Sequence, residues 1–338
     1  MEKIIKDISV SDEFKEGAIR ENRRNLLYNI SPMIVLLCIT AFFSIIAPSF
    51  VSIKNFFNIL NQAAIPLVLS LGLTFVVLTG SIDLSIEGLM CLSGTAVGFL
   101  VANNKNDLNL GVLAVIIIMC LGAACGFISG IIVNKGRIPS FMVTFGISSV
   151  AYGFAKSINS YVASTILDMS FRSIALEKFG SLYYMTWIAL GLFIIAYIVQ
   201  EKTAFGRHLY AIGANEAVSI TSGINVTRVK ITTYIWSGVL ISIAGIMSAA
   251  NIGKGTSLIA INNSLFPSLT AVVVGGTSLS GGKGGVINTL FGVLTVTVFN
   301  NGLIMCGIQP ELQQGMQSLI ILIAVSLSVR RSRKLINK

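Results

Sequence analysis

Two carboxylic acids stand one helical turn apart in a strongly apolar part of the sequence. The stretch LTGSIDLSIEGLM, residues 78–90, contains Asp83 and Glu87 with Ser85 between them, and long apolar runs flank it on both sides. A carboxylate is costly in apolar surroundings unless it is paired or hydrogen-bonded. Residues four apart on a helix share one face, so we expect both acids to share one environment and to mark a polar site.

The composition indicates what surrounds these acids. The chain has 338 residues, of which 54% are hydrophobic and 11% are charged, and its mean hydropathy is +0.83. Soluble domains carry about 25% charged residues, so the sequence excludes a large soluble domain and predicts a membrane protein. The net charge of +10 fits basic residues gathered in cytoplasmic loops beside lipid. We therefore expect no nucleic-acid partner.

Apolar segments long enough to cross a membrane recur along the chain. A span needs about 20 mostly apolar residues. We expect ten spans, at 31–50, 57–79, 85–102, 110–133, 138–156, 182–200, 229–252, 265–280, 286–306 and 314–329. The eighth of these is short and contains Pro267. With both termini in the cytoplasm, 18 of the 24 Lys and Arg residues lie on the inner side, as the positive-inside rule requires.

The predicted fold class is therefore all-α, a polytopic transmembrane helical bundle of about ten spans with both termini cytoplasmic. We divide the chain into a cytoplasmic tail at 1–30, a transmembrane domain at 31–329 and a basic cytoplasmic tail at 330–338. The longest predicted inner loop is 201–228.

Several kinds of chemistry are missing from the sequence. His208 is the only histidine, so one chain contains neither a Ser/His/Asp triad nor a multi-histidine metal site. The five cysteines lie in apolar runs without a CxxC pair, and we expect them to be small buried hydrophobic residues. GGTSLSGGKGG, residues 275–285, lacks the Walker spacing because Thr277 replaces the first glycine and Gly284 follows Lys283. We predict a close-packed turn there, no catalytic residue, no metal and no cofactor.

The inner loop contains a short helix signal in GANEAVSITSG. Asn215 is a good N-cap, Glu216 places an anion in the first turn, and Gly223 suits the position after the C-cap. About seven residues, 216–222, are too few for a helix that is stable alone in water. Either a partner protein or the inner leaflet must hold it, and residue chemistry leaves both open.

This loop, GRHLYAIGANEAVSITSGINVTRVKI at 206–231, resembles the cytoplasmic loop of the ribose-type permeases of ABC importers. Four further segments resemble that family in the same order: NQAAIPLVLSLGLTFVVLTGSIDLSIEG (61–88), IPSFMVTFG (138–146), AVVVGGTSLSGGKG (271–284) and NNGLIMCGI (300–308). The resemblance covers about residues 30–330.

The resemblance implies a permease subunit without enzymatic activity, in the bacterial cytoplasmic (inner) membrane. Its implied partners are an ABC ATPase subunit that hydrolyses ATP, a second permease that is either identical or different, and an extracytoplasmic substrate-binding protein. The implied cargo is a monosaccharide or a related small polar solute. The loop would carry the helix that couples the permease to the ATPase, and the coupling residues would be Gly213, Asn215, Glu216, Ala217 and Gly223.

The sequence departs from the family pattern near its polar motifs. Glu87 stands close to a usual glycine, Ser81 replaces a second glycine, and Leu265-Phe266-Pro267 replaces a usual Glu-Leu-Asp. These changes leave the transporter class intact but put the substrate in doubt. A pentose, a hexose, inositol, a nucleoside and an autoinducer-type molecule all remain open.

Polar residues within predicted spans are candidates for the translocation path, because an ionisable residue in a span is a functional-site hypothesis by default. The sequence leaves three interpretations of the region 80–88 open. Residues 80–84 are a cytoplasmic turn in which Asp83 caps the next helix, or the break lies deeper and faces the path, or the acids lie at the contact with another subunit or the ATPase. Amides either bind sugar hydroxyls or tie helices together. The candidates are Asn61, Gln62, Asp83, Ser85, Glu87, Asn300 and Asn301.

A different class of function is also compatible with two embedded acids. An autonomous secondary transporter would use Asp83 and Glu87 for proton or sodium coupling and would need no ATPase. A membrane scaffold is a third possibility, although it would not need ordered polar breaks. Finally, 76–88 and 272–284 are locally similar, which fits either an internal duplication or two similar helix ends.

Overall fold

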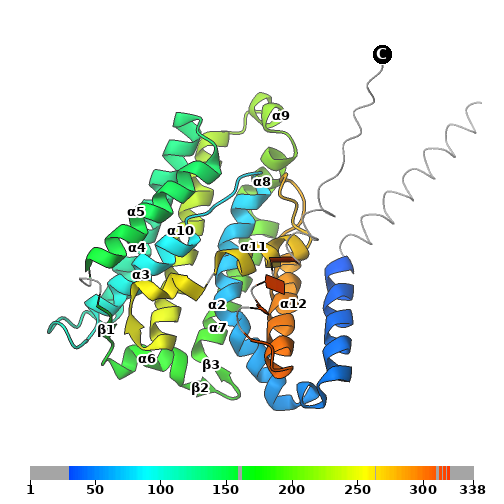
Figure 1. Ribbon diagram of the computed structural model, residues 1–338. Coiled ribbons are helices and arrows are strands. Elements are labelled where there is room, and N and C mark those ends of the chain that lie inside the picture. Colours follow the sequence, from blue (N-terminus) through cyan, green and yellow to red (C-terminus); the bar gives the residue numbers. More distant parts are fainter. Residues whose placement is uncertain are drawn as a thin grey trace, which may run out of the picture.

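The computed structural model describes residues 30–158, 162–262 and 264–309, and in addition 312, 313, 315, 316, 318 and 319. These residues form a helical bundle (Figure 1). The long helices are Ile30–Ile46, α2 (Ile53–Leu78), α3 (Ile86–Leu100), α4 (Val112–Gly136), α5 (Ser140–Ile158), α7 (Tyr184–Lys202), α10 (Val226–Ile252), α11 (Leu265–Val274) and α12 (Val286–Met305).

Short elements connect these helices. The helical ones are η1 (Pro48–Val51), α6 (Met169–Leu176), α8 (Ala204–Ala214), α9 (Glu216–Thr221) and η2 (Ser257–Asn262). Two antiparallel pairs of two-residue strands also occur: β1 (Ser164–Thr165) with β4 (Lys254–Gly255), and β2 (Lys178–Phe179) with β3 (Leu182–Tyr183). The α8–α9 segment and the strand pairs lie at opposite ends of the bundle (Figure 1).

The all-helical class is confirmed, and each predicted segment between 31 and 306 contains a helix. In the described part of the chain, six helices are long and apolar enough to cross a membrane, namely α2, α4, α5, α7, α10 and α12. Ile30–Ile46, α3 and α11 are shorter. The predicted tenth span, 314–329, and both predicted tails lie wholly or mostly outside the described residues.

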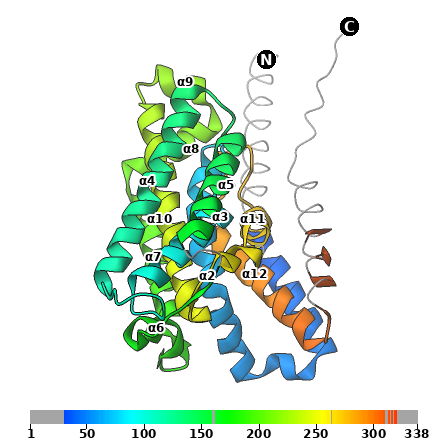
Figure 2. The same ribbon diagram turned by 60° about the vertical axis from the view of Figure 1, so that its left-hand side comes forward.

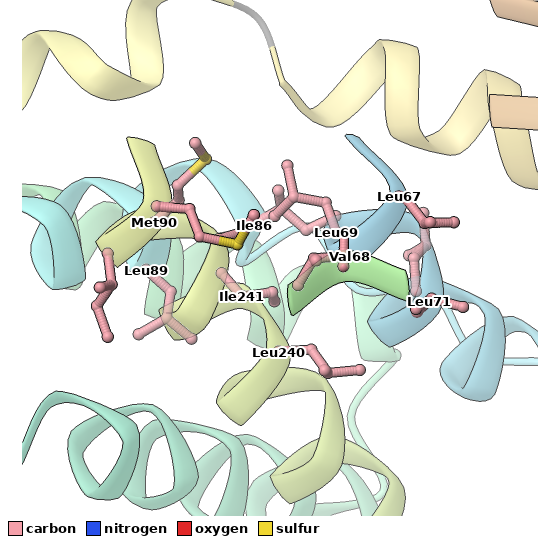
Figure 3. Close-up of a cluster of buried hydrophobic side chains, with 14 of the residues drawn as sticks. Leu67, Val68, Leu69, Leu71, Ile86, Leu89, Met90, Leu240 and Ile241 are labelled. Carbon is pink, nitrogen blue, oxygen red and sulfur yellow. The ribbon is translucent and has the colours of Figure 1, made fainter. Parts of the chain in front are cut away.

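The core lies where α2, α3 and α10 meet, as Figure 3 shows. Leu69 and Leu71 of α2, Leu89 of α3, and Leu240 and Ile241 of α10 are fully or almost fully buried there. The apolar window is 78% buried in α2 and 67% buried in α10, but only 28% buried in α4, α5 and α7. The first two helices therefore form the centre, and the other three expose apolar faces on the outside (Figure 2).

Glycines allow α4 to pack directly against the backbone of α10. Gly122, Gly126 and Gly130 follow each other at intervals of four residues, the small-residue spacing found where membrane helices approach closely. A Cβ atom on Gly126 would lie 2.2 Å from the carbonyl oxygen of Tyr234, and one on Gly122 would lie 2.4 Å from that of Gly238. The contact leaves no room for a side chain.

The expectation that the cysteines are buried is wrong for most of them. All five are free thiols, but only Cys91 is buried, and Cys38, Cys120 and Cys306 are exposed. An apolar run predicts burial only in a soluble protein. In this bundle the outer faces of Ile30–Ile46 and α4 are apolar too.

Replacement of Gly126 by Ala is expected to weaken the α4–α10 contact, because the new methyl group would overlap the Tyr234 carbonyl. Overpacking of this kind costs about 1–3 kcal/mol. Thermal unfolding of the purified protein in detergent measures the loss. Gly146→Ala on α5 is the matched control, since its Cβ would meet no atom within 4 Å, and equal melting temperatures for the two variants would refute the contact.

Candidate functional site

Asp83 lies in a non-helical break, residues 79–85, between α2 and α3. Its side chain is 2% exposed. The Ser85 backbone N–H and hydroxyl donate to Oδ1 of Asp83 at 2.9 and 2.6 Å, and the hydroxyl of Ser237 on α10 donates to Oδ2 at 2.8 Å. The carboxylate therefore holds the break against the central helix through hydrogen bonds from neutral groups.

Three hydroxyl groups on one face of α5 accept backbone N–H groups from this break and from the first turn of α3. They belong to Ser140, Thr144 and Ser148, spaced four residues apart, and we call them the hydroxyl ladder. Ser140 accepts from Ile82 at 3.0 Å, and Thr144 accepts from Leu84 at 2.9 Å. Ser148 accepts at 3.0 Å from Gly88, in the first turn of α3. Two N–H groups of the non-helical break and one of the first turn of α3 thus find their acceptors on α5.

Glu87 does not share the environment of Asp83, and the expectation that it would is wrong. Residues 81–85 are not helical, so the helical spacing on which that expectation rests does not apply. Glu87 is half-buried in the first turn of α3, and its Oε1 has no hydrogen-bond partner among the described residues. The backbone N–H of Leu265, at the start of α11, faces its carboxylate.

The candidate amides take different places. The carbonyl oxygen of Asn61 accepts from the Tyr183 backbone N–H at 3.0 Å and the Thr186 hydroxyl at 2.7 Å. That of Asn301 accepts from the Asn55 amide at 2.9 Å. These buried amides tie helices together. Gln62 is exposed and Asn300 is half-buried.

The glycine-rich segment 275–285, here called the glycine loop, is the predicted close-packed turn. The start of this loop has the same pattern of backbone hydrogen bonds as the end of α2. Gly80 and Ser81 donate to the carbonyls of Val77 and Val76, and in the same way Gly276 and Thr277 donate to those of Val273 and Val272. Both glycines have positive φ, 74° and 92°. The similarity of 76–88 and 272–284 therefore includes two matching Schellman helix ends, and its origin by duplication stays a hypothesis.

The predicted short helix in the inner loop is present as α9, Glu216–Thr221. Asn215 is its N-cap and accepts from the Val218 backbone N–H at 3.1 Å. Gly223 follows the C-cap with φ +82°. α8, which precedes α9 directly, was missed because the sequence reading began its helix signal at Asn215.

Most side chains of α9 point away from the protein. Val218 and Ile220 are each 58% exposed, and Ala217 is exposed as well. Glu216 forms an ion pair with Lys230 of α10 at 2.7 Å. A helix of six residues with exposed apolar side chains has too little contact with its own chain to be explained by internal packing.

A polar pocket of about 760 Å³ lies at the opposite end, between the start of α2 and the β2–β3 hairpin. Its lining includes Lys54, Asn58, Asn61, Lys178 and Tyr183, and it contains no carboxylate. The candidate residue Asn61 thus reaches a cavity, while its carbonyl oxygen also serves helix packing.

Comparison with known proteins identifies the family. The family described as branched-chain amino acid transport system / permease component matches residues 55–325. Ribose import permease protein RbsC of Escherichia coli (strain K12) is 35% identical over 301 residues, which cover 87% of this chain and 91% of the relative. The chain belongs to the ribose-type permease family of ABC importers. No solved structure matches it.

Other members of this family are named for different sugars. Fructose import permease protein FrcC of Rhizobium meliloti is 33% identical over 310 residues, covering 88% of this chain and 84% of the relative. Galactose/methyl galactoside import permease protein MglC of Escherichia coli (strain K12) is 31% identical over 318 residues, covering 89% and 94%. The chain is thus a multi-pass membrane transport subunit rather than an enzyme.

Sequence reasoning missed the residues that support Asp83 and the break. Ser140, Thr144 and Ser148 recur at every fourth position in SFMVTFGIS, residues 140–148, and that spacing was the available signal. It went unused because a hydroxyl in a helix often bonds to its own helix carbonyl four residues back. Ser237 offered no signal, since its link to Asp83 crosses 154 residues of sequence.

Replacement of Thr144 by Val is expected to destabilise the protein, because it keeps the shape but leaves the Leu84 N–H without its acceptor. A buried unsatisfied N–H costs about 1–3 kcal/mol, which thermal unfolding in detergent measures. Ser149→Ala is the control on the same helix, since Ser149 is exposed and donates to the Phe145 carbonyl. Equal stability of Thr144→Val and wild type would rule out the hydroxyl ladder.

Asp83→Asn is expected to lower uptake about tenfold or more at equal membrane abundance. An amide offers one acceptor oxygen to donors that now bind two, and hydrogen bonds to a charged group contribute about 1.5–3 kcal/mol each. Uptake of a labelled solute that wild-type cells accumulate through this protein measures the effect. Asp107→Asn, in the loop after α3, is the control. Wild-type uptake by Asp83→Asn would show that Asp83 is dispensable.

Proposed function

We propose that this chain is the permease subunit of a binding-protein-dependent ABC importer in the bacterial cytoplasmic membrane. It would carry a monosaccharide or a related small polar solute, and ATP hydrolysis in a separate subunit would drive transport. The observation that carries the proposal is similarity along most of the chain to import permeases named for ribose, fructose and galactose.

The proposed orientation places the α8–α9 end in the cytoplasm, with ten spans and both termini on that side. α9 would then dock on the ATPase through Val218 and Ile220, with Gly213, Asn215, Glu216, Ala217 and Gly223 shaping the docking segment. The exposed apolar side chains of α9 support this role, because a partner surface would remove them from water. The polar pocket beside Lys54 would face the extracytoplasmic binding protein.

A second permease subunit would complete the translocation path. The outer apolar faces of α4, α5 and α7, each with only 28% of its apolar window buried, supply surface for lipid and for that subunit. Whether the second permease is an identical or a different chain is left open by the proposal.

Glu87 is the proposed contact with the solute. Oε1 of its carboxylate is buried and has no hydrogen-bond partner among the described residues, and once uncovered it would accept hydrogen bonds from sugar hydroxyls. Asp83 and Ser85 would instead shape the path by fixing the break, since their polar groups already bond within the chain. The named sugars of the relatives favour a neutral monosaccharide over the other open substrates.

The alternative is an ion-coupled secondary transporter that uses Asp83 and Glu87. Two observations argue against it. Asp83 accepts from two serines rather than facing an open site, and the two acids face different elements, α10 and the start of α11. An ion-binding site built from both would need them together.

Affinity purification of the tagged chain from mild-detergent membranes tests the proposal. We expect an ATPase subunit to copurify with the wild type and to be lost, by about tenfold or more, from Val218→Glu. A charge placed in an apolar docking contact costs more than the 1.4 kcal/mol that a tenfold loss represents. Mass spectrometry of the eluate measures the ratio of the two proteins.

Leu108→Glu is the matched control, because Leu108 is an exposed apolar residue in the loop between α3 and α4 at the other end. It should retain the ATPase. A wild-type chain that purifies without any ATPase, and still transports when the candidate ATPase gene is deleted, would favour the ion-coupled alternative.

A further inference from the structure

Three backbone segments from distant parts of the chain touch at the α8–α9 end. They are the end of α2 at 78–80, the end of α8 at 213–214, and residues 281–282 of the glycine loop, and we call their contact the glycine junction. The Gly282 N–H donates to the Leu78 carbonyl at 2.9 Å. This bond joins the helix before the Asp83 break to the loop before α12.

Gly213 fills the space between the other two segments. A Cβ atom at this position would lie 2.0 Å from the carbonyl oxygen of Leu78 and 2.3 Å from the backbone nitrogen of Gly282. A Cβ atom on Gly281 would lie 2.7 Å from the nitrogen of Gly80 and 2.9 Å from the Cα of Gly213. Because all four of these atoms belong to the backbone, no side chain can move aside to relieve the overlap.

Two polar contacts lie beside the junction, one between α8 and the glycine loop and one between α7 and the start of α12. The Tyr210 hydroxyl of α8 donates to the Gly284 carbonyl at 2.7 Å, and the Val286 N–H donates to the Gln200 side chain at 2.8 Å. Burial, with a smaller contribution from the Glu201 carboxylate, raises the pKa of Tyr210 to about 12. The phenol therefore keeps its proton and remains a donor at any physiological pH.

The junction is rigidly connected to α9. Asn215 is at once the C-cap of α8 and the N-cap of α9, so no linker separates the two helices. Gly213 lies two residues before that shared cap. A displacement of α9 must therefore move Gly213, and Gly213 has backbone on both sides.

We propose that the glycine junction is the contact through which movement of α9 reaches both non-helical segments, the break at 79–85 and the glycine loop at 275–285. Gly213 is the positioning residue of this transmission. The inference rests on the proposed function, since the movement comes from an ATPase bound to α9. The inference adds a route by which α9 acts on both the break at 79–85 and the glycine loop.

Hydrogen–deuterium exchange of the copurified permease–ATPase complex, with and without ATP plus vanadate, tests the inference without a known substrate. In the wild type, we expect nucleotide to change exchange in both 79–85 and 275–285. In Gly213→Ala, we expect ATPase to copurify but the change in both segments to fall about fivefold or more, the lower range of measured site-to-site coupling. Gly191→Ala on α7, with no atom within 4 Å of its Cβ, should behave as wild type.

Tyr210→Phe provides a second variant in case Gly213→Ala fails to fold. It removes the bond to the Gly284 carbonyl and adds no atom, so the nucleotide-dependent change should fall in the glycine loop more than in 79–85. A wild-type-sized response in both variants would overturn the inference while leaving the proposed function intact. Absence of ATPase from the wild-type complex would instead overturn the proposed function, and the inference with it.

Discussion

The demand that every buried backbone N–H and C=O group find a partner governs this structure. Where the chain is helical, the helix itself supplies the partners. Between α2 and α3 residues 79–85 are not helical, so the helix supplies no partners there. Two backbone N–H groups of the break at 79–85 therefore donate to the hydroxyl groups of Ser140 and Thr144 on α5. One N–H group in the first turn of α3 donates to the hydroxyl of Ser148. These three hydrogen bonds fix the position of α5 relative to the break.

The glycine loop meets the same demand by a different route. Its backbone bonds to neighbouring backbone and to the Tyr210 hydroxyl, and the Gln200 side chain accepts from Val286 at the start of α12. Backbone-to-backbone bonding requires close approach, and Gly213, Gly281 and Gly282 allow it. Hydroxyl side chains thus support the first non-helical segment, whereas glycines allow direct backbone contact at the second. Both segments meet the backbone of α8 at Gly213, the first through Leu78 and the second through Gly282.

The sequence predicted features that depend on local chemistry and missed those that depend on contacts between distant segments. Apolar runs predicted the helices, and capping preferences correctly predicted that Asn215 and Gly223 lie at the two ends of α9. Glycine content gave the close-packed turn at 275–285. The pairing of Asp83 with Ser237 could not be predicted, because local spacing says nothing about which helix crosses behind a break. The shared face of Asp83 and Glu87 was wrong for a related reason: helical periodicity was extended through five residues that are not helical.

The presence of an acid in this apolar region follows from the number of acceptors that the break needs. Two donors from Ser85 and one from Ser237 converge on the side chain at position 83. A carboxylate offers two oxygens with about four lone-pair sites. An amide offers only one oxygen, and its NH₂ group would face a hydroxyl or N–H group that also donates. The acid at position 83 is therefore explained by the architecture of the break, without any ion to be carried. The unsatisfied oxygen of Glu87 has no such explanation within the described chain. Glu87 therefore remains the proposed contact for the solute, whereas Asp83 is accounted for within the chain.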